Sequence, residues 1–203
     1  MVLLAGFPDD QHSGWGSIPM DLAKEYNCRL LCLCFPDHET GAKTKKWGYD
    51  CEDLLTMLNN TIDHLVPDKS KKIYFVGHDW GSFYGLMYEN RYPQRVEKLI
   101  AIDVGVISSI SSPKISDLLK LVLYQHWFAI CYFISQAINF NLVNYLFKLF
   151  FKIVPKCLHA LTHDKIFHRK DEEVSVSLCY IYYYFWRRYL LSLSFNPFRP
   201  VYP

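Results

Sequence analysis

The sequence predicts an α/β fold, in which a mostly parallel sheet with flanking helices is followed by a helical, aromatic-rich region. Up to Gly105, short apolar runs alternate with longer amphipathic segments, which is typical of parallel strands joined by helices. Beyond Gly105 this alternation stops, and segments rich in Phe, Tyr and Trp follow. Hydrophobic residues make up 51% of the 203 residues, so the chain is long and apolar enough to bury a core.

The first part of the chain is expected to contain four strands and three helices. Each apolar run ends in turn or polar residues, which predicts strands at 2–5, 29–35, 73–76 and 99–104. The segments between them predict helices at 17–26, 49–66 and 82–91. The second helix has the clearest pattern, because Leu54, Leu58, Ile62 and Leu65 recur at helical spacing.

The second part of the chain opens with a serine-rich linker at 108–113 and continues with helices. The apolar stretch 118–154 approaches the length of a membrane span, but polar residues such as Lys120, Gln125 and His126 interrupt it. This pattern favours packed or surface-lying amphipathic helices. A further helix is predicted at 174–193, where strand and helix propensities compete. We therefore expect two domains, residues 1–107 and 108–203.

Charge and cysteine usage exclude several classes of function. A net charge of +2 offers no broad positive field, so no nucleic-acid partner is predicted. The seven cysteines are odd in number, and no Cys/His set has zinc spacing, which predicts a reducing compartment and no metal. The apolar start is too short for a signal peptide, so we expect a cytoplasmic protein, with peripheral membrane contact through the aromatic helices as an addition.

Residues 77–82 (GHDWGS) have the pattern of a nucleophile elbow, with Asp79 in the nucleophile position. Such a nucleophile sits on a sharp turn between a strand and a helix, and only small neighbours let the two approach closely. A carboxylate in this position attacks an electrophilic carbon and forms an alkyl ester that water must later cleave. The N–H of Trp80, at the helix start, is the natural oxyanion donor. The alternative is that Asp79 only caps the helix.

The elbow resembles that of epoxide hydrolases and haloalkane dehalogenases in the α/β-hydrolase superfamily. Three other stretches are similar to that family in the same order: 6–9 (GFPD), 47–54 (WGYDCEDL) and 92–100 (YPQRVEKLI). Together they cover residues 1–105, and the ordered set is more specific than any single motif. The Phe7-Pro8 pair favours epoxide hydrolases.

This resemblance implies a partial α/β-hydrolase fold with a helical cap, and it implies roles for particular residues. Asp79 would be the nucleophile, Phe7 would give the second oxyanion N–H, and cap tyrosines would bind the epoxide oxygen. Tyr182 and Tyr183 are the candidates, with Tyr180 and Tyr184 equally eligible. The implied partner is a hydrophobic small-molecule substrate, with no cofactor. Nothing in the sequence fixes an oligomeric state.

The chain departs from the family pattern in three places. Ala5 stands where the family has His before Gly-Phe-Pro. Two earlier strands are missing, and the chain stops where the strand carrying the triad acid is expected. The family's base histidine also follows the cap, whereas the downstream histidines here lie within the cap-like region: His126, His159, His163 and His168. The adjacent His163-Asp164 pair is a poor dyad, because neighbouring side chains rarely aim at one another's functional atoms.

These departures leave three functions open. The first is an epoxide hydrolase of which the chain is a truncated part. The second is a haloalkane dehalogenase or ester hydrolase with the same elbow. The third is a non-catalytic truncated protein that binds a lipid, a membrane surface or a partner. The missing histidine motivates this third alternative.

Overall fold

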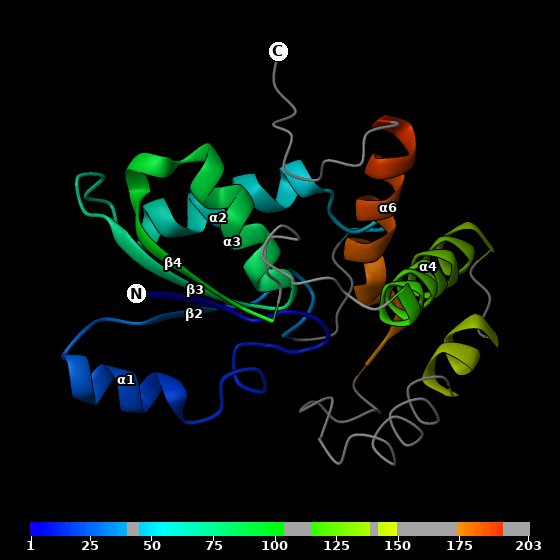
Figure 1. The fold of residues 1–203 in the computed structure, drawn as a ribbon, viewed down its shortest axis with the longest axis horizontal. Helices are drawn as coiled ribbons and strands as arrows, with labels where there is room; N and C mark the ends of the chain where they lie inside the picture. The colour runs from blue at the N-terminus through cyan, green and yellow to red at the C-terminus, as the bar shows by residue number, and fades with distance from the viewer. Residues whose placement is uncertain (40–44, 104–114, 139–141, 150–173, 193–203) are drawn as a thin grey trace. The chain divides into compact units, whose positions relative to one another are not determined.

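The computed structural model describes residues 1–39, 45–103, 115–138, 142–149 and 174–192 (Figure 1). The chain divides into two compact units, which are described separately below. The first is built from Met1–Glu39 and Glu52–Ser109, and the second from Thr40–Cys51 and Ile110–Phe195. The short segment Thr40–Cys51 therefore groups with residues far from it in sequence.

The first unit contains a four-stranded sheet whose pairings are all parallel. Its strand order is β2-β1-β3-β4, and the strands are β1 (Val2–Leu4), β2 (Leu31–Leu33), β3 (Ile73–His78) and β4 (Val96–Ile102). The predicted parallel α/β architecture is confirmed. The predicted strand at 29–35 was too long: β2 has three residues because its neighbour β1 offers three pairing partners, from Val2↔Leu31 to Leu4↔Leu33.

Helices cover both faces of this sheet. Helix α1 (Ile18–Tyr26) lies on one face, and α2 (Cys51–Leu65) and α3 (Trp80–Arg91) lie on the other (Figure 1). A 3₁₀ turn, η1 (Pro93–Arg95), leads from α3 into β4. Two predicted boundaries were late: α3 begins at Trp80 directly after the elbow residue, and β4 begins at Val96, which pairs with Ile73 of β3.

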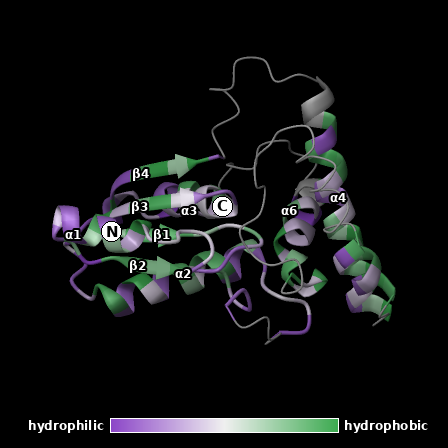
Figure 2. Cartoon of the chain, turned by 90° about the horizontal axis from the view of Figure 1, so that it is seen from below, coloured by the Kyte–Doolittle hydropathy of each residue, from purple (hydrophilic) through white to green (hydrophobic). Residues whose placement is uncertain are grey.

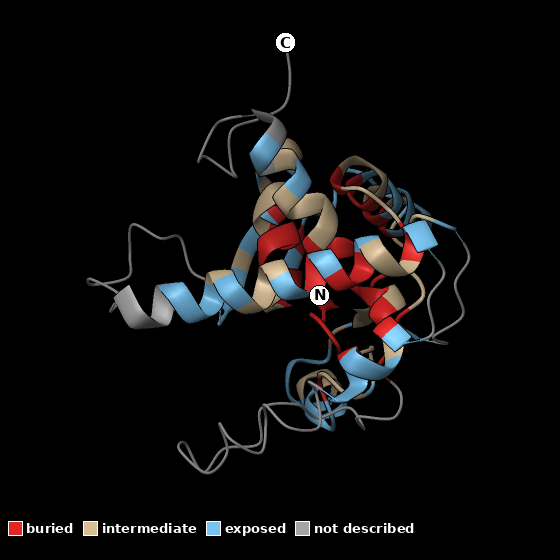
Figure 3. Cartoon of the chain, turned by 90° about the vertical axis from the view of Figure 1, so that its right-hand side faces the viewer, coloured by how far each residue is buried: buried red, intermediate tan, exposed pale blue. Residues whose placement is uncertain are grey.

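The core of the first unit forms around the central strand β1. Val2, Leu3 and Leu4 are all buried, as expected for a parallel strand covered on both faces (Figure 3). On one face, Leu3 packs in a cluster with Trp15 and Val76. The strands β2 and β4 carry mostly hydrophobic residues, whereas α2 alternates hydrophobic and hydrophilic ones, as its exposed outer face requires (Figure 2).

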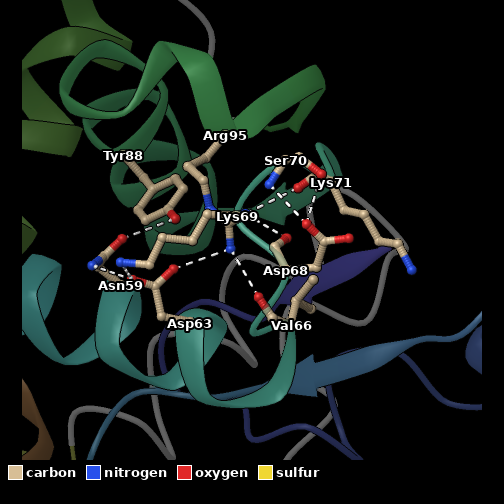
Figure 4. A network of polar contacts seen from close by, with 9 residues as sticks. All are labelled: Asn59, Asp63, Val66, Asp68, Lys69, Ser70, Lys71, Tyr88 and Arg95. Atoms are coloured by element: carbon tan, nitrogen blue, oxygen red, sulfur yellow. Dashed lines mark hydrogen bonds and ion pairs between the residues drawn. The ribbon is translucent and has the colours of Figure 1, made fainter.

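A buried arginine connects the end of α2 to the loop that leads into β3. The Arg95 guanidinium, 5% exposed, pairs with Asp63 Oδ1 at 3.0 Å. It also donates to three backbone carbonyls, those of Val66 (3.2 Å), Asp68 (3.3 Å) and Lys71 (3.0 Å) (Figure 4). A single side chain thereby donates to three carbonyls of the connection between α2 and β3.

Beyond residue 110, the described residues of the second unit are mainly helical. The unit contains α4 (Ile115–Ile138), a helix at 142–149, the 3₁₀ turn η4 (Val176–Cys179) and α6 (Tyr180–Ser192). Helices were predicted in both regions. Aromatic contacts join α4 to α6, with Phe128 and Tyr182 at 5.0 Å between ring centroids. The predicted linker at 108–113 lies outside the described residues.

Helix α4 is long and apolar enough to meet a composition test for a membrane span. The window Leu119–Ile138 has a mean hydropathy of 1.2, and 28% of it is buried. Core helices of soluble proteins and signal sequences pass the same test, so this observation is weak by itself.

Candidate active site

Asp79 occupies a sharp turn between the end of β3 and the start of α3. Its backbone has φ 52° and ψ −123°, a conformation that ordinary residues avoid and that costs about 1–3 kcal/mol. Hydrogen bonds on both sides hold the turn: the Asp79 N–H donates to the Ile102 carbonyl (3.2 Å), and the Asp79 carbonyl accepts from the Ser82 N–H (2.9 Å). Asp79 is the N-cap residue of α3, but its side chain makes no capping hydrogen bond to the second or third residue of the helix.

Three glycines allow this turn to form. A Cβ on Gly77 would lie 2.5 Å from the Gly81 carbonyl oxygen, and a Cβ on Gly81 would overlap the carbonyl oxygen of Leu4 in β1. A Cβ on Gly6, in the loop after β1, would lie 2.5 Å from Asp79 Oδ2. Two of these glycines let α3 start close to the sheet, and the third leaves room for the carboxylate.

The Asp79 carboxylate is buried and is held by backbone N–H groups from two segments. The Phe7 N–H donates to Oδ2 at 2.9 Å, and the Trp80 N–H also hydrogen-bonds the side chain. Burial raises the pKa of Asp79 to about 6, while the Trp80 and Phe7 N–H groups and the His78 charge act in the lowering direction. The carboxylate is therefore mostly ionised at neutral pH, in a site that withholds water from it.

The arrangement can support attack by a carboxylate followed by hydrolysis of an ester. In the described structure Phe7 and Trp80, the two residues selected as oxyanion donors from the sequence, direct their N–H groups at the same carboxylate. When a carboxylate becomes an ester and then a tetrahedral intermediate, negative charge develops on its oxygen. N–H groups already aimed at that oxygen stabilise this charge without reorganising.

Comparison with known families identifies the fold. Residues 1–128 match the family model described as alpha/beta hydrolase fold, which is more than half of the chain. The chain belongs to the α/β-hydrolase fold family. It is also 32% identical over 104 residues to human epoxide hydrolase 4, which confirms the resemblance to epoxide hydrolases. That match covers 51% of this chain and 27% of the relative, so the chain spans about a quarter of that protein's length.

Two solved structures are similar to this α/β-hydrolase chain. One is epoxide hydrolase I of potato (Solanum tuberosum), with a TM-score of 0.46 and 23% identity, covering 63% of this chain and 41% of the other. The second is Cfl2 of Burkholderia cenocepacia, with a TM-score of 0.40 and 17% identity, covering 63% of this chain and 48% of the other.

Beside the nucleophile position, the α/β-hydrolase unit contains a His–Asp contact that the sequence did not indicate. His78 Nε2 lies 3.8 Å from Asp103 Oδ2, and the two residues stand at the ends of the adjacent strands β3 and β4. From the sequence, His78 was interpreted as a structural residue of the elbow, and Asp103 was not considered. The carboxyl ends of neighbouring parallel strands meet at one edge of the sheet, but this contact depends on the register of β3 against β4, which no local pattern contains.

The remaining histidines of interest fall into two groups. In α4, His126 Nδ1 lies 2.7 Å from the Val122 carbonyl oxygen. The His126 ring packs against Trp186, with 3.9 Å between the ring centroids. His126 is therefore a half-buried histidine engaged in packing within the second unit. His159, His163 and His168 lie outside the described residues, as does Asp164.

The two candidate tyrosines belong to the second unit and have different surroundings there. Tyr182 is 3% exposed and packs against Phe128. The Tyr183 ring stacks on Phe133, with 6.0 Å between the ring centroids, and its centroid lies 6.1 Å from that of Trp47. Tyr180 is fully buried beside Tyr49.

The described residues hold no group of three or more His, Cys, Asp and Glu side chains suited to a metal ion. The six described cysteines are free, and the two cysteines Cys131 and Cys179 are buried in the second unit. Burial raises the pKa of both thiols. Buried, protonated thiols pack as small hydrophobic groups.

Proposed function

We propose that this chain carries the nucleophile and oxyanion site of an epoxide hydrolase, acting on hydrophobic epoxides. The observation that carries the proposal is the buried Asp79 carboxylate, which is fixed by the Phe7 and Trp80 N–H groups on a strained turn. The resemblance to epoxide hydrolases supports the choice of substrate class. The match covers 27% of that relative, and the activity is proposed for a whole enzyme and not for this chain alone.

The first step forms an ester. A carboxylate oxygen of Asp79 attacks one carbon of the epoxide, the bond from that carbon to the epoxide oxygen breaks, and the oxygen leaves as an alkoxide that must receive a proton. A tyrosine hydroxyl of the cap-like region is the proposed donor, with Tyr182 and Tyr183 as the candidates.

The second step cleaves the ester. Water adds to the acyl carbon of the Asp79 ester, the Phe7 and Trp80 N–H groups stabilise the oxyanion, and the diol leaves as the carboxylate re-forms. This step needs a base for the water. Of the histidines named from the sequence, His126 is engaged in packing within the second unit, and His159, His163 and His168 lie outside the described residues.

The test is covalent labelling. The protein is incubated with 1,2-epoxyoctane and analysed by intact-mass and peptide mass spectrometry. We expect one adduct on the peptide containing Asp79, absent in Asp79→Ala and retained in Asp68→Ala, whose carboxylate is exposed. Labelling that persists in Asp79→Ala contradicts the proposal. Halide release from 1-chlorooctane with no reaction of the epoxide assigns the dehalogenase alternative instead.

A second candidate function, contact with a membrane surface, is favoured by one face of α4. Leu119, Leu123, Trp127 and Ile130 follow one another at spacings of four, four and three residues, which places them on one side of the helix. Their exposed fractions are 57%, 60%, 39% and 51%. A helix face with leucine and tryptophan exposed is the kind that lies in a lipid interface.

The charges of the second unit suit an anionic lipid surface. In sequence, its residues 40–51 and 110–195 include thirteen Lys and Arg against six Asp and Glu. Flotation with vesicles of phosphatidylcholine containing phosphatidylserine tests this proposal. We expect binding that falls with salt and is lost in a Leu123→Gln, Trp127→Gln variant, but kept in Tyr74→Gln, which removes an exposed aromatic from the first unit. Equal binding by both variants contradicts it.

A further inference from the structure

The loop that follows β1 carries one of the two N–H groups at the Asp79 carboxylate, and His38 lies against this loop. His38 comes from the loop after β2 and is fully buried. Its Nδ1 lies 3.2 Å from the Asp9 carbonyl oxygen. Its ring meets the Phe7 ring edge-on, with 6.1 Å between the ring centroids. His38 therefore contacts the β1 loop on both sides of Pro8.

The hydrogen bond between His38 and Asp9 has a defined direction. A carbonyl oxygen only accepts hydrogen bonds, so His38 Nδ1 carries the proton and donates it. Asp9 is buried, as His38 is, so water does not readily replace this donor. Loss of the donor should therefore displace the Asp9 backbone, because a buried carbonyl is costly to leave without its hydrogen bond.

The Phe7 N–H lies between two backbone anchors. Before it, the Ala5 N–H donates to the last carbonyl of β2 (3.4 Å). After it, His38 holds the Asp9 carbonyl. Between these anchors, the Phe7 N–H donates to Asp79 Oδ2 at 2.9 Å. The direction of the Phe7 N–H thus depends on β2 and on the loop that follows β2.

His38 is itself fixed by a turn and by aromatic packing. Its N–H donates to the Phe35 carbonyl (3.1 Å), and Asp37 between them has a left-handed φ of 68°. The buried Phe35 ring contacts the His38 ring, with 5.6 Å between centroids, and the Tyr84 ring of α3, with 5.2 Å. The loop after β2 is thereby packed against the helix that begins at the elbow.

We propose that His38 is a positioning residue for the Phe7 N–H. Its Nδ1–H holds the Asp9 carbonyl, and this keeps the β1 loop in the conformation that aims the Phe7 N–H at the Asp79 carboxylate. His38 touches neither epoxide nor water in this scheme and acts through the loop backbone. An N–H stabilises developing charge best when it is oriented in advance. The inference deepens the proposed function, and its kinetic consequence rests on that function.

The test compares two variants of similar shape, His38→Asn and His38→Leu. Both lose the imidazole ring, but the asparagine amide can donate from the place of Nδ1, whereas leucine cannot. The measurement is hydrogen exchange of the Phe7 amide, by NMR in protein labelled with ¹⁵N-phenylalanine and assigned with Phe7→Leu. We expect exchange at least about tenfold faster in His38→Leu and within about threefold of the parent in His38→Asn.

Two controls accompany this comparison. His12→Leu removes an exposed imidazole from the same β1 loop, and its Phe7 amide should exchange as in the parent. Circular dichroism checks that each variant is folded. Should His38→Leu not fold, His38→Phe takes its place, because it keeps an aromatic ring beside Phe7 and Phe35 but has no donor.

The labelling rate separates the positioning role from the proposed function. Labelling of Asp79 by 1,2-epoxyoctane should be about tenfold slower in His38→Leu and largely restored in His38→Asn. Fast Phe7 exchange confined to His38→Leu supports the positioning role even where no epoxide adduct forms, an outcome that overturns the proposed function alone. Equal Phe7 exchange in the two folded variants overturns the positioning role, while adduct formation at Asp79 leaves the proposed function standing.

Discussion

At the scale of single residues, the site is defined by the environment of one carboxylate. Asp79 sits in a conformation that its neighbours must enforce, is removed from water, and accepts hydrogen bonds from two backbone N–H groups. Its pKa of about 6 lies above the ordinary aspartate value of 3.8, so folding disfavours the ionised form. The carboxylate therefore costs stability at the pH at which it would react.

The first prediction follows from that pKa. Because the folded-state pKa is raised, the contribution of Asp79 to stability is fully present below pH 3.8 and is lost as the pH rises to about 6. We expect Asp79→Asn to raise the free energy of unfolding by about 1–3 kcal/mol at pH 7.5, with the difference vanishing near pH 4. Urea denaturation at several pH values measures it. A difference that does not change with pH contradicts the prediction.

The second prediction concerns Gly6. An added Cβ would lie 2.5 Å from Asp79 Oδ2, so Gly6→Ala should displace the carboxylate and slow epoxide labelling at least tenfold. The control is Gly16→Ala, where an added Cβ meets nothing within 4 Å but the backbone has φ +54°. That variant should lose about 1 kcal/mol of stability and keep its labelling rate. Similar labelling by both variants would show that Gly6 is dispensable.

At the scale of elements, parallel strands and their connections carry the site. The loop after β1 supplies Phe7, the β3–α3 turn supplies Asp79 and Trp80, and the end of β4 supplies Asp103. Three segments far apart in sequence meet because parallel strands bring their carboxyl ends to the same edge. The loop between α2 and β3 lies outside this site, and its role is structural.

The third prediction addresses that loop through Arg95. Replacement by Met removes the buried cation, leaves the Asp63 carboxylate without this partner and takes donors from the Val66, Asp68 and Lys71 carbonyls. We expect a loss of about 3–5 kcal/mol in the free energy of unfolding. Lys72→Met serves as the comparison, because its pair with Glu97 is about half exposed, and the loss should stay under about 1 kcal/mol. Equal losses would refute the buried network as a source of stability.

Local patterns predicted the elements well and their ends less well. The α2 pattern is visible because Leu54, Leu58 and Ile62 repeat at helical spacing, and small residues at the elbow mark a strand-to-helix turn. The length of β2 depends on how many partners β1 offers, which no local pattern contains. The contact between His78 and Asp103 was missed for the same reason: it depends on the register of β3 against β4.

At the scale of the whole molecule, the chain combines an α/β-hydrolase unit with a second, mainly helical unit. The second unit includes the segment Thr40–Cys51, which comes from the first half of the sequence. In this segment, Trp47 contacts Tyr183 of α6, and Tyr49 contacts Tyr180 of α6. Gly48 lies between them with φ +63°, and a Cβ there would lie 2.5 Å from the Tyr180 Cβ. Sequence patterns did not indicate that the segment Thr40–Cys51 belongs to the second unit, since aromatic contacts between residues so far apart in sequence leave no periodic signal.

The fourth prediction tests the contact between the segment Thr40–Cys51 and α6. Gly48→Ala should weaken the packing of the segment Thr40–Cys51 against α6, because both the backbone conformation and the space beside Tyr180 exclude a methyl group. Hydrogen exchange should become at least tenfold faster for α6 amides and stay unchanged for β1 amides. Gly16→Ala again gives the comparison for a positive φ without a close contact. Unchanged exchange in α6 would mean that the segment does not depend on this contact.

The doubly hydrogen-bonded Ile102 carbonyl also gives the molecule a built-in spectroscopic reporter. A carbonyl that accepts two donors vibrates at a lower frequency than one that accepts one, and here the donors are the Asp79 N–H and the Ser82 hydroxyl. A ¹³C label placed on this carbonyl would separate its infrared band from the rest of the sheet. Its position would follow, in real time and without any substrate, whether the turn that presents Asp79 is assembled.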